Sequence, residues 1–198
     1  MSHTPKLVVL AGPNGAGKTT AANRLIRDVL GVEHFVNADE IAKGLSAFRT
    51  GDVAIGAGRL MLNRLNELSS ERSSFAFETT LASRTFAPWI HERIRDGYAF
   101  HLIFLWLPRV DMAIERVAHR IREGGHAVPE ETVRRRYEAG LRNFFELYRP
   151  LTTRWSFYDN STDKKSRRIA VGHGTTTTRI IDRKTWNLVE SEWGNAGS

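Results

Sequence analysis

Continuous runs of apolar residues recur along the chain and are bounded by glycine, proline or polar residues. The first covers residues 7–10, and the strongest is AFHLIFLWL at residues 99–107, which Pro108 ends. A strand with one solvated face would alternate apolar and polar positions, so continuous runs predict strands that are buried on both faces. Three further strands are predicted at residues 34–36, 75–77 and 155–161.

Segments whose apolar residues have helical spacing lie between these runs. Residues 52–68, 84–95 and 110–122 each carry such a stripe. Another helix is expected after Pro129, because proline is favoured in the first helical turn. Its core stripe would be Val133, Tyr137, Leu141, Phe144 and Tyr148. The alternation of strands and helices predicts an α/β fold with a parallel sheet of about five strands, covered by helices on both faces.

The C-terminal part departs from this alternation. Residues 167–182, RRIAVGHGTTTTRIID, predict a β-hairpin, and residues 184–193 predict a terminal helix or tail. The sequence contains no internal repeat and no evident linker. We therefore predict a single domain over residues 1–198, with a helical lid at about 110–148 and a small C-terminal hairpin and tail at about 164–198.

A glycine-rich turn follows the first apolar run and spells Gly12-x-x-x-x-Gly17-Lys18-Thr19. This is the P-loop spacing, in which backbone N–H groups and a helix N-terminus form a cradle for phosphates. Lys18 would reach the β- and γ-phosphates of ATP, and the Thr19 hydroxyl would hold Mg²⁺. The alternative is a glycine turn that only joins strand to helix. We expect a P-loop NTPase fold of the nucleoside-kinase-like type, with ATP and Mg²⁺ as cofactors. The expected nucleotide-binding residues are Gly12, Pro13, Asn14, Gly15, Ala16, Gly17, Lys18, Thr19 and Thr20.

Composition excludes some kinds of reaction but does not identify the partner. The chain has 198 residues, a net charge of +7 and no cysteine, which excludes thiolate nucleophiles, disulfides and cysteine-ligated zinc. No segment approaches the length of a membrane span and none resembles a signal peptide, so we expect a soluble, cytoplasmic protein without a membrane partner. The positive charge favours anionic partners, and nucleotides, sugar phosphates and nucleic acids all qualify.

Polar residues that follow the buried strands are further candidates for the functional site, because ligands bind beyond the carboxyl ends of parallel strands. This rule selects residues 37–39, 78–80 and 159–161. Asp39 could take the proton from an acceptor hydroxyl that attacks the γ-phosphate, or it could only cap the following helix.

Glu78 also has two alternative roles, in substrate binding or in helix capping. With the hydroxyls of Thr79 and Thr80 it would suit the hydroxyl groups of a sugar, since a carboxylate accepts and hydroxyls also donate. Alternatively, this segment caps the next helix.

Arginines flank a second glycine turn, EGGHAVP at residues 123–129. Such a helical hairpin could close over ATP and place guanidinium groups against the transferring phosphoryl group. The alternative is a solvated basic helix face. The arginines are Arg116, Arg120 and Arg122 before the turn, and Arg134, Arg135 and Arg136 after it. Motor and switch proteins are disfavoured, because a plain aspartate of the Walker B type follows an apolar strand only at Asp159.

Several of these segments together resemble the zeta toxin family of P-loop kinases, particularly its short, chromosomally encoded members. The resemblance rests on GPNGAGKTT, NADEIAKGLS, FETTL, the RV..RI..GGH.VP...VRRRY segment and RRIAVGHG. It implies transfer of the ATP γ-phosphate to a sugar nucleotide, in the toxins to the 3′-hydroxyl of the amino sugar of UDP-N-acetylglucosamine. The resemblance also implies an antitoxin protein as a candidate partner.

The resemblance further implies roles for individual residues. Asp39 matches the general base and Glu78 the substrate-binding carboxylate, with Thr79 and Thr80 beside it, while Lys18 and Thr19 keep their P-loop roles. Arg120 is the first choice for a lid arginine that contacts phosphate, and Arg135 is the second.

The function predicted from the sequence is therefore an ATP- and Mg²⁺-dependent small-molecule kinase acting on a sugar nucleotide. The alternative is a nucleic-acid-binding P-loop protein or polynucleotide kinase that uses the basic lid and the basic run at residues 164–168. That run contains no aromatic residue for base stacking, which makes nucleic acid the less favoured partner.

Overall fold

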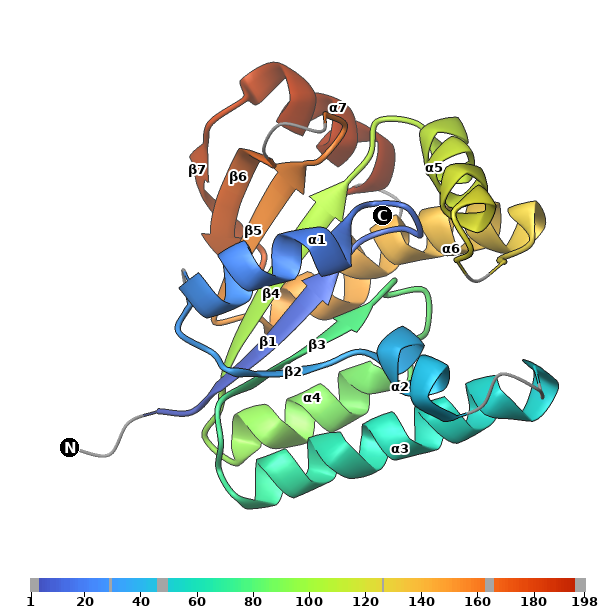
Figure 1. Cartoon of the computed structure of the whole chain (residues 1–198). Helices are drawn as coiled ribbons and strands as arrows, with labels where there is room; N and C mark the ends of the chain where they lie inside the picture. The colour runs from blue at the N-terminus through green and yellow to red at the C-terminus, as the bar shows by residue number, and fades with distance from the viewer. Residues whose placement is uncertain (1–3, 29, 46–49, 126, 163–165, 195–198) are drawn as a thin grey trace.

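The computed structural model describes residues 4–28, 30–45, 50–125, 127–162 and 166–194 of the chain (Figure 1). Seven strands form one sheet in the order β2-β3-β1-β4-β5-β6-β7. The strands are β1 (Lys6–Ala11), β2 (His34–Val36), β3 (Phe75–Thr79), β4 (Ala99–Trp106), β5 (Arg154–Asp159), β6 (Arg167–His173) and β7 (Thr176–Ile180).

Helices connect the strands at nearly the predicted positions. They are α1 (Lys18–Ala22), α2 (Ala38–Leu45), α3 (Thr50–Ser70), α4 (Phe86–Arg95), α5 (Val110–Arg122), α6 (Glu130–Asn143) and α7 (Arg183–Trp193). The turns Asn23–Asp28 and Phe144–Tyr148 are π-helical and continue α1 and α6, and Arg149–Leu151 is a 3₁₀ turn. In the described part of the chain, no helix is both long and apolar enough to cross a membrane.

The five strands from β2 to β5 are parallel, which confirms the predicted α/β fold. Strand β1 lies at the centre, because it pairs with β3 on one side and β4 on the other. Its register opposite β3 places Leu10 next to Glu78 and Ala11 next to Thr79. The carboxyl end of β3 therefore meets the chain where it leaves β1 for the P-loop.

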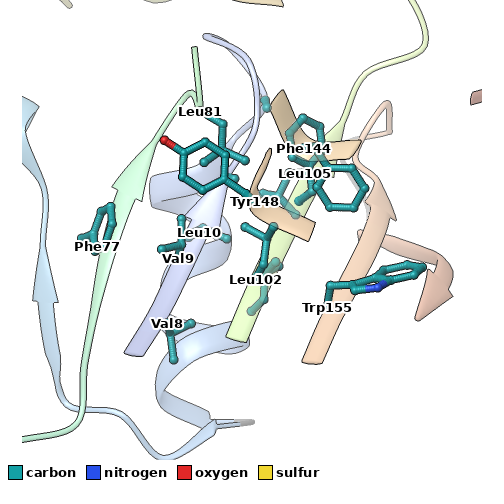
Figure 2. Packing of buried hydrophobic residues seen from close by; sticks show 14 of the residues in the cluster. Val8, Val9, Leu10, Phe77, Leu81, Leu102, Leu105, Phe144, Tyr148 and Trp155 are labelled. Atoms are coloured by element: carbon teal, nitrogen blue, oxygen red, sulfur yellow. The ribbon is translucent and has the colours of Figure 1, made fainter. Parts of the chain in front are cut away.

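The core fills both faces of these strands. Figure 2 shows Val8, Val9 and Leu10 of β1 among residues of β3, β4, β5 and the end of α6. In Figure 1, α1 lies on one face of the sheet and α6 on the other. The stripe predicted for α6 is buried along its whole length, from Val133 to Tyr148. Its last turn packs Phe144 against Phe104 and Phe157, at ring-centroid distances of 5.1 and 5.2 Å.

The predicted C-terminal hairpin forms, and it also extends the sheet. Strand β6 pairs antiparallel with β5, for example Ser156 opposite Val171, and β7 pairs antiparallel with β6. Helix α7 then returns over the hairpin, and its Trp186 stacks on Trp155 of β5 at 5.3 Å. The guanidinium of the buried Arg149 lies 4.9 Å from the Trp155 ring and donates to the carbonyl of Thr175. The hairpin and α7 therefore share a core with the parallel strands.

Candidate functional site

The P-loop lies between the end of β1 and the start of α1, as the motif predicts. Gly12, Gly15 and Gly17 have φ angles of 143°, 76° and 73°, in the region that side chains with a Cβ rarely adopt. A Cβ on Gly12 would also lie 2.3 Å from the carbonyl oxygen of Leu105 in β4. Only glycine therefore fits at Gly12, and the loop is packed tightly onto the sheet.

Lys18 is buried inside this loop and has 7% of its surface exposed. Its Nζ donates to the carbonyl oxygens of Gly12 and Pro13, both at 2.9 Å, and lies 3.7 Å from Oε1 of Glu78. Burial lowers the pKa of Lys18 below its usual value, while the carboxylates of Glu78 and Asp39 counteract part of that shift. The ammonium is thus held by two backbone oxygens of the P-loop and lies beside one carboxylate.

Glu78 is the residue that joins the separate parts of the site. Its Oε2 accepts a hydrogen bond from the Thr19 hydroxyl at 3.0 Å and another from the Asn37 side-chain amide at 3.1 Å. The alternative of a helix cap at this segment is wrong, because α4 begins only at Phe86. The Thr79 and Thr80 hydroxyl oxygens accept from the backbone N–H groups of the residues two positions on, and so stabilise their own turn.

Asn37 is a site residue to which our sequence reasoning assigned no role, although the rule on strand ends selected residues 37–39. Its Oδ1 accepts a hydrogen bond from the backbone N–H of Asp39 at 2.8 Å, which makes Asn37 the N-cap of α2. The alternative that Asp39 only caps this helix is therefore wrong. Asparagine directly before a predicted helix was the signal that could have identified the cap.

Asp39 lies in the first turn of α2 and is exposed to solvent. It is close enough to Lys18 for its carboxylate to raise the pKa of that lysine. One asparagine therefore orients both candidate carboxylates: Asn37 bonds the side chain of Glu78 and the backbone of Asp39. The Asp39 side chain is therefore exposed to solvent and lies near enough to Lys18 to act on its charge.

The arginines of the predicted lid have different surroundings. Arg120 of α5 lies near enough to Lys18 for its charge to lower the pKa of the lysine. Arg134 bridges the two lid helices, because it bonds Asp111 at 3.1 Å and Glu130 at 2.8 Å. Arg135 is exposed on α6, and the contacts of the described residues do not join it to the P-loop. The glycine turn between the helices includes His126, which lies outside the described residues.

Arg116 and Asn160 brace the P-loop from outside. The Arg116 guanidinium donates to the carbonyl oxygens of Asn160 at 2.9 Å, Ser161 at 2.8 Å and Gly15 at 3.4 Å. The Asn160 amide donates to the Ala16 carbonyl at 2.6 Å and its Oδ1 accepts from the Ser166 hydroxyl at 2.6 Å. The loop after β5 thus connects the P-loop both to α5 and to the start of the C-terminal hairpin.

The Asn160 brace predicts a defined loss on mutation. Asn160→Ala should weaken ATP binding about fivefold to tenfold, the scale of one lost hydrogen bond, because the Ala16 carbonyl would lose its donor. Titration of ATP by calorimetry would measure this. Thr178→Ala is the control, since the Thr178 hydroxyl bonds Val171 within the hairpin and should leave ATP affinity unchanged. Equal affinities in all three proteins would show that the brace is dispensable.

Comparison with known proteins identifies the family. The family model for zeta toxin matches residues 1–163, which include the P-loop, both carboxylates and helices α5 and α6. The chain belongs to the zeta toxin family. An uncharacterized protein of Haemophilus influenzae is 26% identical over 132 residues, which are 67% of this chain and 92% of that protein.

Solved structures share the fold of this zeta toxin family member. A crystal structure of AvrRxo1-ORF1:AvrRxo1-ORF2 with sulphate ions superposes with a TM-score of 0.73 at 17% identity, over 94% of this chain. The chain spans only 63% of the length of that protein. The structure from the PezAT chromosomal toxin–antitoxin system of Streptococcus pneumoniae gives a TM-score of 0.66 at 15% identity, over 96% of this chain and 86% of that one.

Proposed function

We propose that this zeta toxin family protein uses ATP and Mg²⁺ to phosphorylate a hydroxyl group of a sugar nucleotide similar to UDP-N-acetylglucosamine. The observation that carries the proposal is the meeting of Lys18, Glu78 and Asp39 at the carboxyl ends of three parallel strands. A buried cation and two carboxylates of different exposure suit a transfer from a phosphate chain to a hydroxyl.

The residues present fit both cofactors. Only glycine fits at Gly12, Gly15 and Gly17, because a Cβ there would lie 2.3 to 2.8 Å from neighbouring protein atoms, and the buried ammonium of Lys18 lies against the loop backbone. The Thr19 hydroxyl and the Glu78 carboxylate offer the oxygen atoms that Mg²⁺ prefers. When bound, Mg²⁺ would neutralise charge on the β- and γ-phosphates. A structure of the AvrRxo1-ORF1:-ORF2 complex was determined with ATP, which supports ATP as the nucleotide here.

In the proposed reaction each residue acts on a stated group. The P-loop amides and Lys18 hold the β- and γ-phosphates. Asp39 accepts the proton of the acceptor hydroxyl. The hydroxyl oxygen attacks the γ-phosphorus, and ADP leaves. Arg120 places a positive charge against the equatorial oxygens of the phosphoryl group as it transfers. Closure of the α5–α6 hairpin would exclude water, so that the sugar hydroxyl is the nucleophile.

A mass-spectrometric screen would test this function. A panel of sugar nucleotides, free sugars and nucleosides is incubated with the protein, ATP and Mg²⁺, and each compound is examined for the added mass of a phosphoryl group. We expect a UDP-sugar to gain that mass, and Lys18→Ala to abolish the gain. Release of phosphate from ATP without any modified acceptor would overturn the proposal in favour of an NTPase.

The nucleic-acid alternative gains no support from the basic residues. Arg116 and Arg134 are engaged within the protein. In the basic run, Lys164 lies outside the described residues, Arg167 bonds Asp159 and Asp182, and Arg168 lies over the Tyr158 ring at 5.9 Å. An antitoxin protein is a better-supported partner, because PezAT is described as a toxin–antitoxin system. Size-exclusion chromatography with proteins encoded beside the gene would test for such a complex.

Arg120 should contribute mainly to the transition state. Arg120→Ala is expected to lower kcat for acceptor phosphorylation more than it raises KM for ATP, because charge spreads onto the equatorial oxygens during transfer. Steady-state kinetics over a range of ATP concentrations would separate the two effects. Arg135→Ala is the matched control and should change both parameters less, since Arg135 is exposed on α6. A change in KM alone would make Arg120 a ground-state binding residue.

A further inference from the structure

A buried residue in a strained backbone conformation follows the end of β3. Leu81 has a φ angle of 58°, which residues with a Cβ rarely adopt, and its side chain is fully buried. Among the described residues, Arg72 is the other non-glycine residue with a positive φ, and it lies in an exposed turn after α3. Backbone strain of this kind persists only where the surroundings hold it, and it is concentrated at functional sites.

Helix α6 makes contacts that hold this loop. Nδ2 of Asn143 donates to the carbonyl oxygens of Leu81 at 2.8 Å and Ala82 at 3.3 Å, and Asn143 is only 5% exposed. Gly140 lies one turn earlier on α6, and a Cβ there would be 2.4 Å from the carbonyl oxygen of Thr80. Helix α6 therefore lies against three consecutive carbonyl groups of the loop.

Both of these α6 residues are unfavourable for the helix itself. Glycine weakens a helix because its backbone loses more freedom on folding, and asparagine inside a helix is neutral to unfavourable. A larger residue at Gly140 would displace the Thr80 carbonyl, and an apolar residue at Asn143 would leave the Leu81 carbonyl without its donor. The sequence of α6 thus favours the conformation of the loop over the stability of the helix, which is expected where the loop has a function.

Strand order gives the loop a position in the proposed reaction. The order β2-β3-β1 of these parallel strands puts the end of β3 between the end of β2, which Asp39 follows, and the P-loop after β1. An acceptor that reaches from Asp39 to the γ-phosphate would therefore lie in front of the chain that leaves β3. We propose that residues 80–83 form the surface against which the phosphoryl acceptor binds, and that Asn143 and Gly140 position this acceptor loop.

Asn143 is a positioning residue in this proposal and does not touch the acceptor. Its amide is buried and bonds the backbone of the acceptor loop. The P-loop is braced separately, by Arg116 of α5 and by Asn160 after β5. A change at Asn143 should therefore alter the use of the acceptor and leave the binding of ATP intact.

Steady-state kinetics with UDP-N-acetylglucosamine as the acceptor probe test the proposal. Asn143→Ala and Gly140→Ala should each lower kcat/KM for this acceptor about tenfold to a hundredfold, the scale for displacing a reactant by about 1 Å. The KM for ATP should stay unchanged. Gly140→Ala removes no hydrogen bond and alanine is the better helix former, so helix propensity cannot explain its loss. Gly58→Ala is the matched control within α3, where a Cβ would meet no atom within 4 Å, and it should behave like the wild type.

Amide hydrogen exchange gives a second measurement that needs no acceptor. Peptides that cover residues 80–83 should exchange faster in both α6 variants than in the wild type and Gly58→Ala. The Tyr148 hydroxyl still bonds the Ser83 carbonyl in both variants, so we expect the loop to shift and the fold to survive. Thermal midpoints check the fold, and an Asn143→Ala variant that does not fold leaves Gly140→Ala to decide.

The inference rests on the proposed function, and the two can fail separately. A wild type that does not phosphorylate the sugar nucleotide would remove the proposed function and the acceptor loop with it. A wild type that does so, beside folded α6 variants with unchanged acceptor kinetics or unchanged exchange at residues 80–83, would overturn the positioning role alone. Equal losses in ATP affinity and acceptor use would also overturn it, because α6 would then support the fold in general.

Discussion

Asp39→Asn should lower phosphoryl transfer to the acceptor by about a hundredfold or more, the usual scale for loss of a general base. Asparagine keeps the shape of the side chain but cannot accept a proton at neutral pH. ATP should still bind, because the P-loop contacts are untouched. Acceptor turnover, ATP affinity and the thermal midpoint of the variant would be measured together.

Because Asn37 caps α2, substitutions at Asp39 test its catalytic role without removing a helix cap. Because Asn37 and not Asp39 caps α2, Asp39→Ala should also leave stability nearly unchanged. Asn37→Ala should instead lose about 1 kcal/mol, the usual cost of removing an N-cap. Unchanged turnover in Asp39→Asn would remove Asp39 from the catalytic residues and leave the protein without an identified base.

Lys18→Ala should reduce transfer by about a hundredfold to a thousandfold, the scale seen when a preorganised group that stabilises transition-state charge is removed. The ammonium lies against the backbone of the P-loop, where the β- and γ-phosphates are proposed to bind. Rates under saturating ATP would be compared with the wild type. Near-normal turnover with every acceptor tested would end the kinase proposal.

The fold should survive loss of Lys18. Burial lowers the pKa of this lysine, so folding disfavours its charged form and the charge itself contributes no net stability near neutral pH. The thermal midpoint of Lys18→Ala should therefore stay close to that of the wild type. A large fall in the midpoint would mean that lost activity reports unfolding, and Lys18→Met, which keeps the aliphatic length, would then separate the two effects.

The strands and most helices were predictable because each is a local pattern. The run at residues 99–107 is too apolar for anything but a buried element, and β4 occupies it almost completely. The helix expected at 110–122 has the same bounds in the structure, and the stripe expected for α6 is buried. The predicted hairpin also forms, but its pairing with β5 depends on which edge of the sheet is open, and a local pattern carries no such information.

The sequence predicted individual residues of the site but not the contacts between them. The P-loop spacing, Asp39 and Glu78 were each visible in the sequence, but Glu78 and Thr19 are 59 residues apart and meet only because β3 is next to β1. Asn160 was missed for a similar reason, since its partner Ala16 is 144 residues away. Its position just after a buried strand was the available signal, and the same rule had selected residues 159–161.

Asn160 also ties the stability of the phosphate loop to that of the C-terminal hairpin. It bonds Ala16 with one end of its side chain and Ser166, just before β6, with the other. Proteins open locally in cooperative units, and a ligand that binds only the closed form stabilises every unit on which that form depends. ATP held in the cradle would therefore slow amide hydrogen exchange in β6, a strand that contributes no residue to the site. Hydrogen exchange in the hairpin would in this way report whether ATP occupies the P-loop, to which β6 and β7 contribute no residue.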